Sequence, residues 1–186
     1  MVNLNKIKRV GLGFGFGGAF SKESKYNLNK KNTLKFFCKS KLGNFIDTSI
    51  SYGDGDSEKI IGKIKNNIKQ KNFISTKVAA ENLTFDKFIG STLKSLKNLH
   101  VKKIDLIQPH WPNYDVKNDE IIKAFNYLKK NKKVRYFGLS NYDLKDIKYF
   151  KKKLKGSFKF IQDEFSIRDR SLENKIKFFE KNNIKI

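Results

Sequence analysis

Short runs of β-branched and aromatic residues recur along the chain at a nearly constant interval. Between them lie longer segments in which apolar residues repeat with helical spacing. Strand followed by helix, repeated many times, is typical of parallel strands joined by right-handed crossovers. The runs lie at residues 10–16, 45–48, 73–77, 104–108, 134–139, 160–165 and 184–186.

Two of the intervening segments show the helical pattern most clearly. In the first, apolar side chains repeat at i, i+3 and i+4 positions from Phe85 to Leu99, with Thr84 as a possible N-cap and Asp86 in the first turn. In the second, residues 121–128 place apolar side chains on one side and lysines on the other. Both segments predict amphipathic helices that pack against a sheet.

The interval between the runs predicts the fold class. From Val10 to Ile184 the six intervals average 29 residues, so eight units would take about 230 residues, close to the roughly 250 of a typical (β/α)8 barrel. We therefore expect an α/β fold of the TIM-barrel type that is incomplete, with about six βα units plus the start of a seventh strand. Residues 1–186 are expected to form a single domain lacking the last two units, since no Pro-, Ser- or Gly-rich linker divides them. An open α/β sheet is the alternative fold.

The composition narrows the class of partner. The chain has 37 Lys and 4 Arg against 18 acidic residues, a net charge of +23. The lysines are spread along the chain and Arg, the better reader of phosphate and guanine, is scarce, so we favour a solvated surface over a specific nucleic-acid site. Five glycines in residues 10–20 argue against a signal peptide, and no stretch approaches the roughly 20 apolar residues of a membrane span. With Cys38 as the one cysteine, these features predict a cytoplasmic protein without an intrachain disulfide.

Polar residues follow five of the predicted strands, at the carboxyl end of each one. In a parallel barrel those ends meet at the rim that carries the active site. Lys77 alone carries little information because about one residue in five is Lys, and Asp47 alone could merely cap the next helix. Only two histidines occur; His110 lies at a strand end, whereas His100 lies at a helix end and is interpreted as structural. The residues at the predicted rim are Asp47, Tyr52, Lys77, His110, Ser140, Asn141 and Gln162.

Four of these residues together have the chemistry to protonate a carbonyl oxygen. An ammonium beside a phenol favours the phenolate, so Lys77 is expected to lower the pKa of Tyr52 from its ordinary value of about 10. Asp47 would keep that ammonium charged in a low-dielectric pocket, and His110 would orient the carbonyl oxygen. The carbonyl carbon also needs a hydride, which no side chain supplies, so a nicotinamide cofactor is implied.

The same segments resemble the aldo-keto reductase family. The stretch Asp47-Thr-Ser-Ile-Ser-Tyr-Gly53, with Ser57-Glu58 and Gly62, is similar to that family's strand-two signature. Ser75-Thr-Lys77 is similar to its strand-three lysine, and Asp105-Leu-Ile-Gln-Pro-His110-Trp-Pro to its strand-four histidine segment. Ser49 stands where alanine is usual in the family.

The resemblance implies a reductase with a catalytic quartet of Asp47, Tyr52, Lys77 and His110. It also implies a small-molecule aldehyde or ketone as substrate, no metal, and NADPH (or NADH) as the cofactor. Two further groups follow from it: a set that holds the nicotinamide carboxamide and an aromatic that lines the substrate pocket. The first set is Ser140, Asn141 and Gln162, and the aromatic is Trp111.

In that family the parts that grip the cofactor come largely from the seventh and eighth units, which the predicted fold lacks. These parts are the aromatic that stacks on the nicotinamide and the loops around the pyrophosphate and the adenosine 2′-phosphate. A catalytically silent truncated reductase that acts as a binding or regulatory module is therefore the alternative function.

One further motif points elsewhere. The stretch Gly13-Phe-Gly-Phe-Gly-Gly18 fits the G-x-G-x-x-G fingerprint of dinucleotide-binding Rossmann units. Such a unit also needs a helix directly after the glycines and an acidic residue about 20 residues further on, but position 38 is Cys. We interpret the motif instead as a glycine-rich first βα loop that lies near the substrate.

Overall fold

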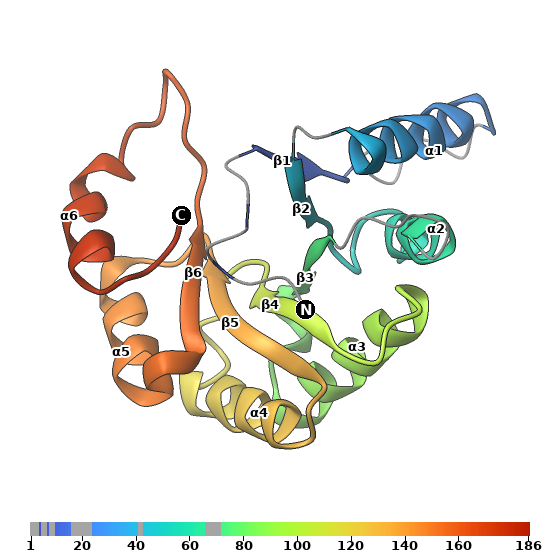
Figure 1. The fold of residues 1–186 in the computed structure, drawn as a ribbon. Helices are drawn as coiled ribbons and strands as arrows, with labels where there is room; N and C mark the ends of the chain where they lie inside the picture. Colours follow the sequence, from blue (N-terminus) through green and yellow to red (C-terminus); the bar gives the residue numbers. More distant parts are fainter. Residues whose placement is uncertain (1–3, 5–6, 8–9, 16–23, 41–42, 66–71) are drawn as a thin grey trace.

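The computed structural model describes residues 4, 7, 10–15, 24–40, 43–65 and 72–186. It contains one six-stranded parallel sheet whose strands follow one another in chain order, from β1 to β6. The sheet is curled, and helices lie along its outer side (Figure 1). The strands are β1 (Val10–Gly13), β2 (Gly43–Asp47), β3 (Phe73–Val78), β4 (Ile104–Pro109), β5 (Val134–Ser140) and β6 (Phe158–Gln162).

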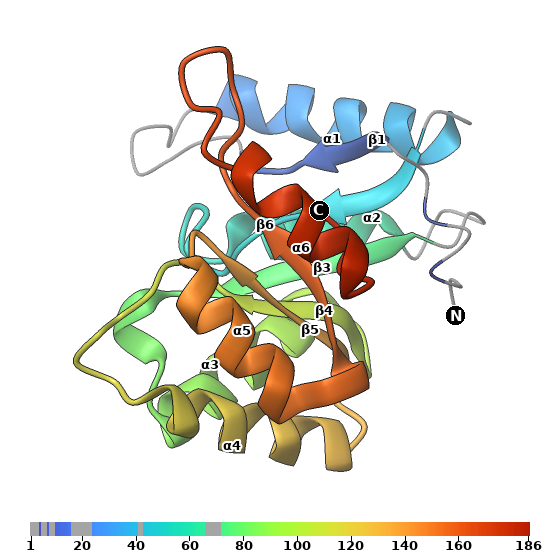
Figure 2. The ribbon, with the colours of Figure 1, turned by 90° about the vertical axis from the view of Figure 1, so that its left-hand side faces the viewer.

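A helix follows each strand, and Figure 2 shows the same alternation from the side. The helices are α1 (Ser24–Lys39), α2 (Asp56–Lys65), α3 (Phe85–Asn98), α4 (Asn118–Lys130), α5 (Leu144–Leu154) and α6 (Glu173–Lys181). Chain-order strands characterise a (β/α) barrel, whereas a doubly wound open sheet reverses its order at a switch point. The prediction of an incomplete barrel-type fold is therefore confirmed, and the open-sheet alternative is wrong.

The predicted start of a seventh strand also has a counterpart. Lys185 forms a parallel bridge with Phe160 of β6. The Ile161 amide donates to the Lys185 carbonyl at 2.9 Å, and the Lys185 amide donates to the Lys159 carbonyl at 2.8 Å. Within the predicted seventh strand at 184–186, Lys185 thus pairs with β6.

Several predicted element boundaries are wrong, and two of the predicted runs extend three residues past the strand that they form. The run at 160–165 forms a strand only as far as Gln162, because the Asp163 carboxylate instead accepts hydrogen bonds from the Asn141 amide and from Lys175. Strand β1 ends at Gly13 rather than at residue 16, and residue 16 itself lies outside the described residues. Thr84 does occupy the N-cap position of α3, but its side chain makes no capping hydrogen bond; the Phe85 amide donates to Glu120 instead.

The main apolar core lies between the sheet and the helices. The predicted helix stripes contribute to it: Phe88 and Leu96 from α3, and Ile121, Phe125 and Leu128 from α4, are all buried there. A second, smaller cluster consists of Phe73, Leu106 and Phe160, with Phe45 and Tyr136 packed against it. Three of these side chains lie two or four positions before a rim residue of the same strand: Phe45 before Asp47, Phe73 before Lys77 and Phe160 before Gln162. Since alternate residues of a strand share a face, the second cluster and the rim lie on the same, concave side of the sheet.

Neither a membrane-spanning helix nor a metal-binding cluster of side chains occurs within the described ranges. No helix there is long and apolar enough to cross a bilayer. No group of three His, Cys, Asp or Glu side chains there is placed to hold a metal ion.

Candidate active site

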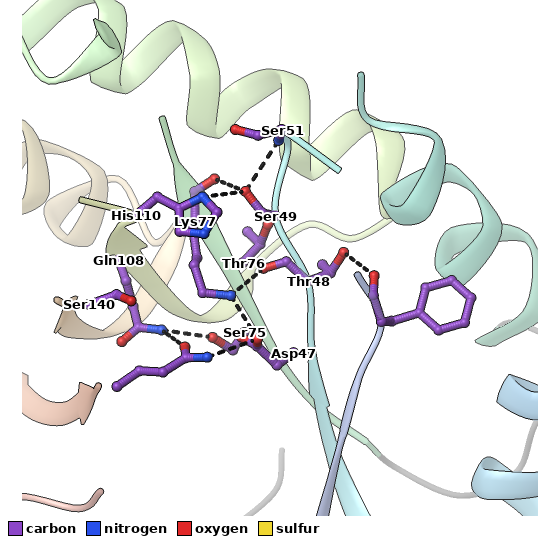
Figure 3. Close-up of polar contacts among 12 residues, drawn as sticks. Asp47, Thr48, Ser49, Ser51, Ser75, Thr76, Lys77, Gln108, His110 and Ser140 are labelled. Atoms are coloured by element: carbon purple, nitrogen blue, oxygen red, sulfur yellow. Dashed lines mark hydrogen bonds and ion pairs between the residues drawn. The ribbon is translucent and has the colours of Figure 1, made fainter. Parts of the chain in front are cut away.

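The centre of the candidate site is an ion pair between neighbouring strands. Asp47 is the last residue of β2, and Lys77 is the penultimate residue of β3. Lys77 Nζ donates to Asp47 Oδ2 at 2.7 Å and to the Thr48 carbonyl at 3.0 Å (Figure 3). The Lys77 side chain is 1% exposed, so burial lowers its pKa, while the charge of Asp47 and its hydrogen bond act in the opposite direction.

Tyr52 lies on the loop between β2 and α2, beside this pair. Lys77 Nζ is 5.4 Å from the centroid of its ring. Gly15, in the first βα loop, approaches the same ring so closely that an added Cβ would lie 3.1 Å from Tyr52 Cε2. Gly15 of the glycine motif therefore lies beside Tyr52, whereas residues 16–18 of the motif are outside the described residues.

The expected pKa of Tyr52 is wrong in direction. Burial raises the pKa of Tyr52 above its ordinary value, and the negative charge of Asp47 raises it further. The physical reason is that the Lys77 ammonium is already paired at 2.7 Å, so the phenol meets a nearly neutral couple and loses water. Tyr52 thus holds its proton firmly at neutral pH.

A buried carboxylate fixes the loop that carries Tyr52. Glu58, in the first turn of α2, is fully buried and accepts hydrogen bonds from Thr76 at 2.6 Å and from Asn98 at 3.0 Å. These contacts tie the loop to β3 and α3. Gly55 has φ of 84°, and a Cβ there would lie 2.7 Å from Asn98 Nδ2. Only glycine fits this turn, because a side chain would meet both the strained backbone and the amide.

His110 follows β4 and faces Tyr52. Its ring is edge-on to the phenol, with centroids 5.5 Å apart and an interplanar angle of 81°. Its amide donates to the Val78 carbonyl at 2.8 Å, and its Nδ1 lies 3.3 Å from Ser49 Oγ. Burial lowers the pKa of His110, and the charge of Lys77 lowers it further, so the ring is neutral at pH 7.

The residues predicted to hold the carboxamide lie on the same rim. Asn141 Nδ2 donates to the His110 carbonyl at 2.9 Å and to Ser140 Oγ at 3.1 Å. Asn141 has φ of 63°, a left-handed conformation that Asn tolerates well. Gln162 Nε2 donates to Asp47 Oδ2 at 3.1 Å, so β6 contacts the ion pair directly.

Sequence reasoning missed Gln108. It is 1% exposed, and its Nε2 donates to Ser75 Oγ at 3.2 Å and to Gln162 Oε1 at 3.0 Å. It therefore links β3, β4 and β6 beneath the ion pair (Figure 3). The available signal was an amide at the end of the predicted strand Ile104-Asp-Leu-Ile-Gln108. Gly138 on β5 provides the room, since a Cβ there would lie 2.7 Å from Gln108 Oε1.

Two predicted residues lie outside this network. Trp111 follows His110 directly, but it is 55% exposed and makes no hydrogen bond with the quartet among the described residues. His100 lies just past α3 with φ of 51° and is exposed, which fits its interpretation as structural. The quartet, Ser140, Asn141 and Gln162 are thus brought together, whereas Trp111 is an exposed residue next to His110 in sequence.

Sequence comparison finds relatives along most of the chain. The Aldo/keto reductase family profile matches residues 10–186. Aldo-keto reductase YhdN of Bacillus subtilis is 31% identical over 148 residues, which cover 74% of this chain and 44% of that protein. The NADH-specific methylglyoxal reductase of Escherichia coli is 27% identical over 155 residues, covering 72% and 47%. The chain therefore spans less than half the length of these curated relatives.

Solved structures of aldo-keto reductases are similar to this chain in fold. The thermostable aldo-keto reductase Tm1743, solved with the inhibitor epalrestat, superposes with a TM-score of 0.86 at 29% identity, covering 94% of this chain and 65% of that one. An aldo/keto reductase from Klebsiella pneumoniae, solved with NADP and acetate, superposes with a TM-score of 0.83 at 20% identity, covering 94% and 60%.

Proposed function

Because the chain belongs to the aldo/keto reductase family, we propose that it serves in the reduction of an aldehyde or ketone to an alcohol by NAD(P)H, with Tyr52 as the proton donor. One observation carries this proposal: the buried Lys77–Asp47 pair lies within 5.4 Å of the Tyr52 ring centroid, with His110 edge-on to the same ring. Of the phenols among the described residues, Tyr52 is the one flanked by both an ammonium and an imidazole.

The four side chains divide the work of protonation. Tyr52 Oη holds a proton at neutral pH and releases it to the carbonyl oxygen as negative charge develops there. Lys77 then stabilises the phenolate that remains, because its ammonium is the nearest positive charge. Asp47 keeps that ammonium charged, and neutral His110 orients the carbonyl oxygen. A proton from water restores the phenol.

The site fits a nicotinamide cofactor, which would supply the hydride to the carbonyl carbon. Asp47 Oδ1 and Gln108 Oε1 are buried and have no hydrogen-bond partner among the described residues. Buried acceptors without partners are costly, and they suit a ligand that brings hydroxyl or amide donors, as a ribose and a carboxamide do. Ser140 and Asn141 are the side chains that would hold the carboxamide. Gln162 would also take part, although its amide is already bonded to Asp47 and Gln108.

The relatives suggest the class of carbonyl and of cofactor to try first. The relative in Escherichia coli is named a methylglyoxal reductase specific for NADH, which supports a small, reactive dicarbonyl as a substrate. NADPH is the cofactor that the family resemblance implies, so both nicotinamides belong in the test.

The proposal is tested by mixing the chain with methylglyoxal and NADPH or NADH and following the absorbance of the reduced nicotinamide. Tyr52→Phe removes the proton donor and should lower kcat by about 10²- to 10⁴-fold, the usual contribution of general acid catalysis. Cofactor binding, measured by the fluorescence of the reduced nicotinamide, should be unchanged. Tyr136→Phe, on the concave side of β5 away from the rim, is the matched control and should keep full activity.

Retained activity in Tyr52→Phe would contradict the assignment of the proton donor. Cofactor binding without turnover in the unmodified chain would favour the alternative function, a silent reductase that acts as a binding module.

A further inference from the structure

Ser49 is a buried hydroxyl that the proposed mechanism leaves without a role. It lies between Asp47 and Tyr52 in sequence, is completely buried, and its Oγ is 3.3 Å from Nδ1 of His110. Its carbonyl accepts the Tyr52 amide at 3.1 Å. Ser49 thus contacts both residues that face the carbonyl.

The hydroxyl of Ser49 has three polar neighbours and one hydrogen to donate. The Ser51 amide donates to Ser49 Oγ at 3.2 Å, so one neighbour is a donor (Figure 3). The other two are potential acceptors: His110 Nδ1 at 3.3 Å and the Lys77 carbonyl at 3.5 Å. The hydroxyl can donate to only one of them.

The surroundings favour Nδ1 as the acceptor. The Lys77 carbonyl already accepts a hydrogen bond from the Ile50 amide at 3.4 Å, whereas the Ser49 hydroxyl is the partner of Nδ1 among the described residues. Donation to Nδ1 therefore leaves every one of these groups with a partner. Donation to the carbonyl would use the longest of the three contacts and would give that carbonyl a second donor.

We propose that Ser49 is a positioning residue for His110: its hydroxyl donates to Nδ1, so that the ring hydrogen resides on Nε2 and is available to the carbonyl oxygen of the substrate. The two ring nitrogens of a neutral imidazole share one hydrogen between them. If Nδ1 accepts a hydrogen bond, that hydrogen must therefore be on Nε2. The neutral state itself follows from burial and from the charge of Lys77, which both lower the pKa of His110. The role of Nε2 towards a substrate rests on the proposed function, but the tautomer does not.

The tautomer can be measured directly in the complete chain, without cofactor or substrate. Histidine labelled with ¹⁵N is incorporated, and long-range ¹H–¹⁵N spectra at pH 8 distinguish the ring nitrogen that carries hydrogen from the one that does not. His100→Asn removes the second set of signals and is tolerated, because Asn accepts the left-handed backbone at that position. We expect the hydrogen of His110 to be on Nε2. A hydrogen on Nδ1 would overturn the proposal, and this result needs no variant of Ser49.

Substitution then tests whether Ser49 is the cause. In Ser49→Ala the ratio of the Nε2–H to the Nδ1–H tautomer should fall about fivefold to tenfold, the factor expected for one lost hydrogen bond. Ser49→Thr keeps the hydroxyl and should restore the ratio. Ser95→Ala is the matched control, since it removes another buried hydroxyl in α3 and should leave the ratio unchanged. An unchanged ratio in Ser49→Ala would also overturn the proposal.

Activity separates this inference from the proposed function. If the unmodified chain reduces methylglyoxal, Ser49→Ala should lower kcat about fivefold to tenfold with an unchanged KM for the nicotinamide, and Ser49→Thr should recover it. A chain that is inactive but has the Nε2–H tautomer contradicts the proposed function and supports the role of Ser49.

Discussion

Two ion pairs at opposite ends of the sheet show how differently one fold uses the same charges. At the carboxyl ends of the strands, Lys77 Nζ lies 2.7 Å from Asp47 Oδ2, with Lys77 1% exposed. Near the amino ends of β4 and β5, Arg135 lies 3.9 Å from Asp105, and each side chain is 21% exposed. The first pair is tight and largely shielded from solvent, with Asp47 14% exposed, and the second is looser and more solvated.

The neighbours of the two pairs differ as well. In the lower pair, Arg135–Asp105, Asp105 also accepts the Ile74 amide at 3.2 Å, and the Arg135 guanidinium lies 4.8 Å from the Tyr136 ring centroid. The charges of the Lys77–Asp47 pair likewise have second partners, the Thr48 carbonyl and the Gln162 amide. The two pairs differ in their surroundings: at the Lys77–Asp47 pair, called the upper pair from here on, Asp47 Oδ1 and Gln108 Oε1 are buried without a partner among the described residues. An arrangement that gives up stability in this way suits a binding site, whereas the lower pair suits packing.

The largest test of this contrast compares the two cations. Lys77→Met leaves the Asp47 carboxylate, which is 14% exposed, with the Gln162 amide but without a cation, and should lower the free energy of unfolding by about 3 kcal/mol. Arg135→Met should cost about 1 kcal/mol, because Asp105 keeps the Ile74 amide and some contact with water. Urea unfolding at pH 7 measures both values. Equal losses would contradict the distinction between the two pairs.

A smaller test uses the pH dependence of the lower pair. Burial raises the pKa of Asp105 above its ordinary value of 3.8, against the opposing effects of the Ile74 amide and Arg135. A raised pKa in the folded state means that the contribution of Asp105 to stability is present below pH 3.8 and is lost as the pH rises through the raised value.

Asp105→Asn cannot titrate and should therefore remove this loss. As the pH rises from 3.8 through the raised pKa, the stability of the unmodified chain should decline relative to Asp105→Asn. Urea midpoints across that range give the difference. A constant difference between the two proteins would show that the Asp105 pKa is not raised.

The smallest expected effect concerns His110, at the carboxyl ends of the strands. Here stability is lost as the pH falls, whereas for Asp105 it is lost as the pH rises. Burial and the charge of Lys77 lower the pKa of His110 below 6.5. Its contribution to stability is therefore present above pH 6.5 and is lost as the pH falls through the lowered value. Below pH 6.5 the stability of His110→Gln should change less with pH than that of the unmodified chain, by roughly 0.5 kcal/mol, since solvent reaches the half-buried ring. The same urea series measures it, and a steeper acid loss in His110→Gln would contradict the assignment.

The polar network shows where sequence reasoning stopped. The strand-end pattern identified Asp47, Lys77 and His110, since each ends or follows a parallel strand and such ends converge. Gln108 also ends the predicted strand 104–108, but it was missed because an uncharged amide has no titration to single it out and its partner Gln162 lies 54 residues away in sequence. The pKa of Tyr52 was expected in the wrong direction because the effect of Lys77 depends on how tightly Asp47 neutralises it.

The amino-acid sequence by itself determined the succession of strands and helices, the barrel-type order and the residues available at the rim, because hydrophobic periodicity and strand-end position are local properties. The tertiary structure alone decided how the rim residues pair. Curling the sheet places Gln162 against Asp47, 115 residues apart, and Ser49 against His110, 61 residues apart. The burial of each side chain, the geometry of its hydrogen bonds and the sign of its pKa shift follow from this curling of the sheet. They depend on distances between segments, which the linear pattern does not contain.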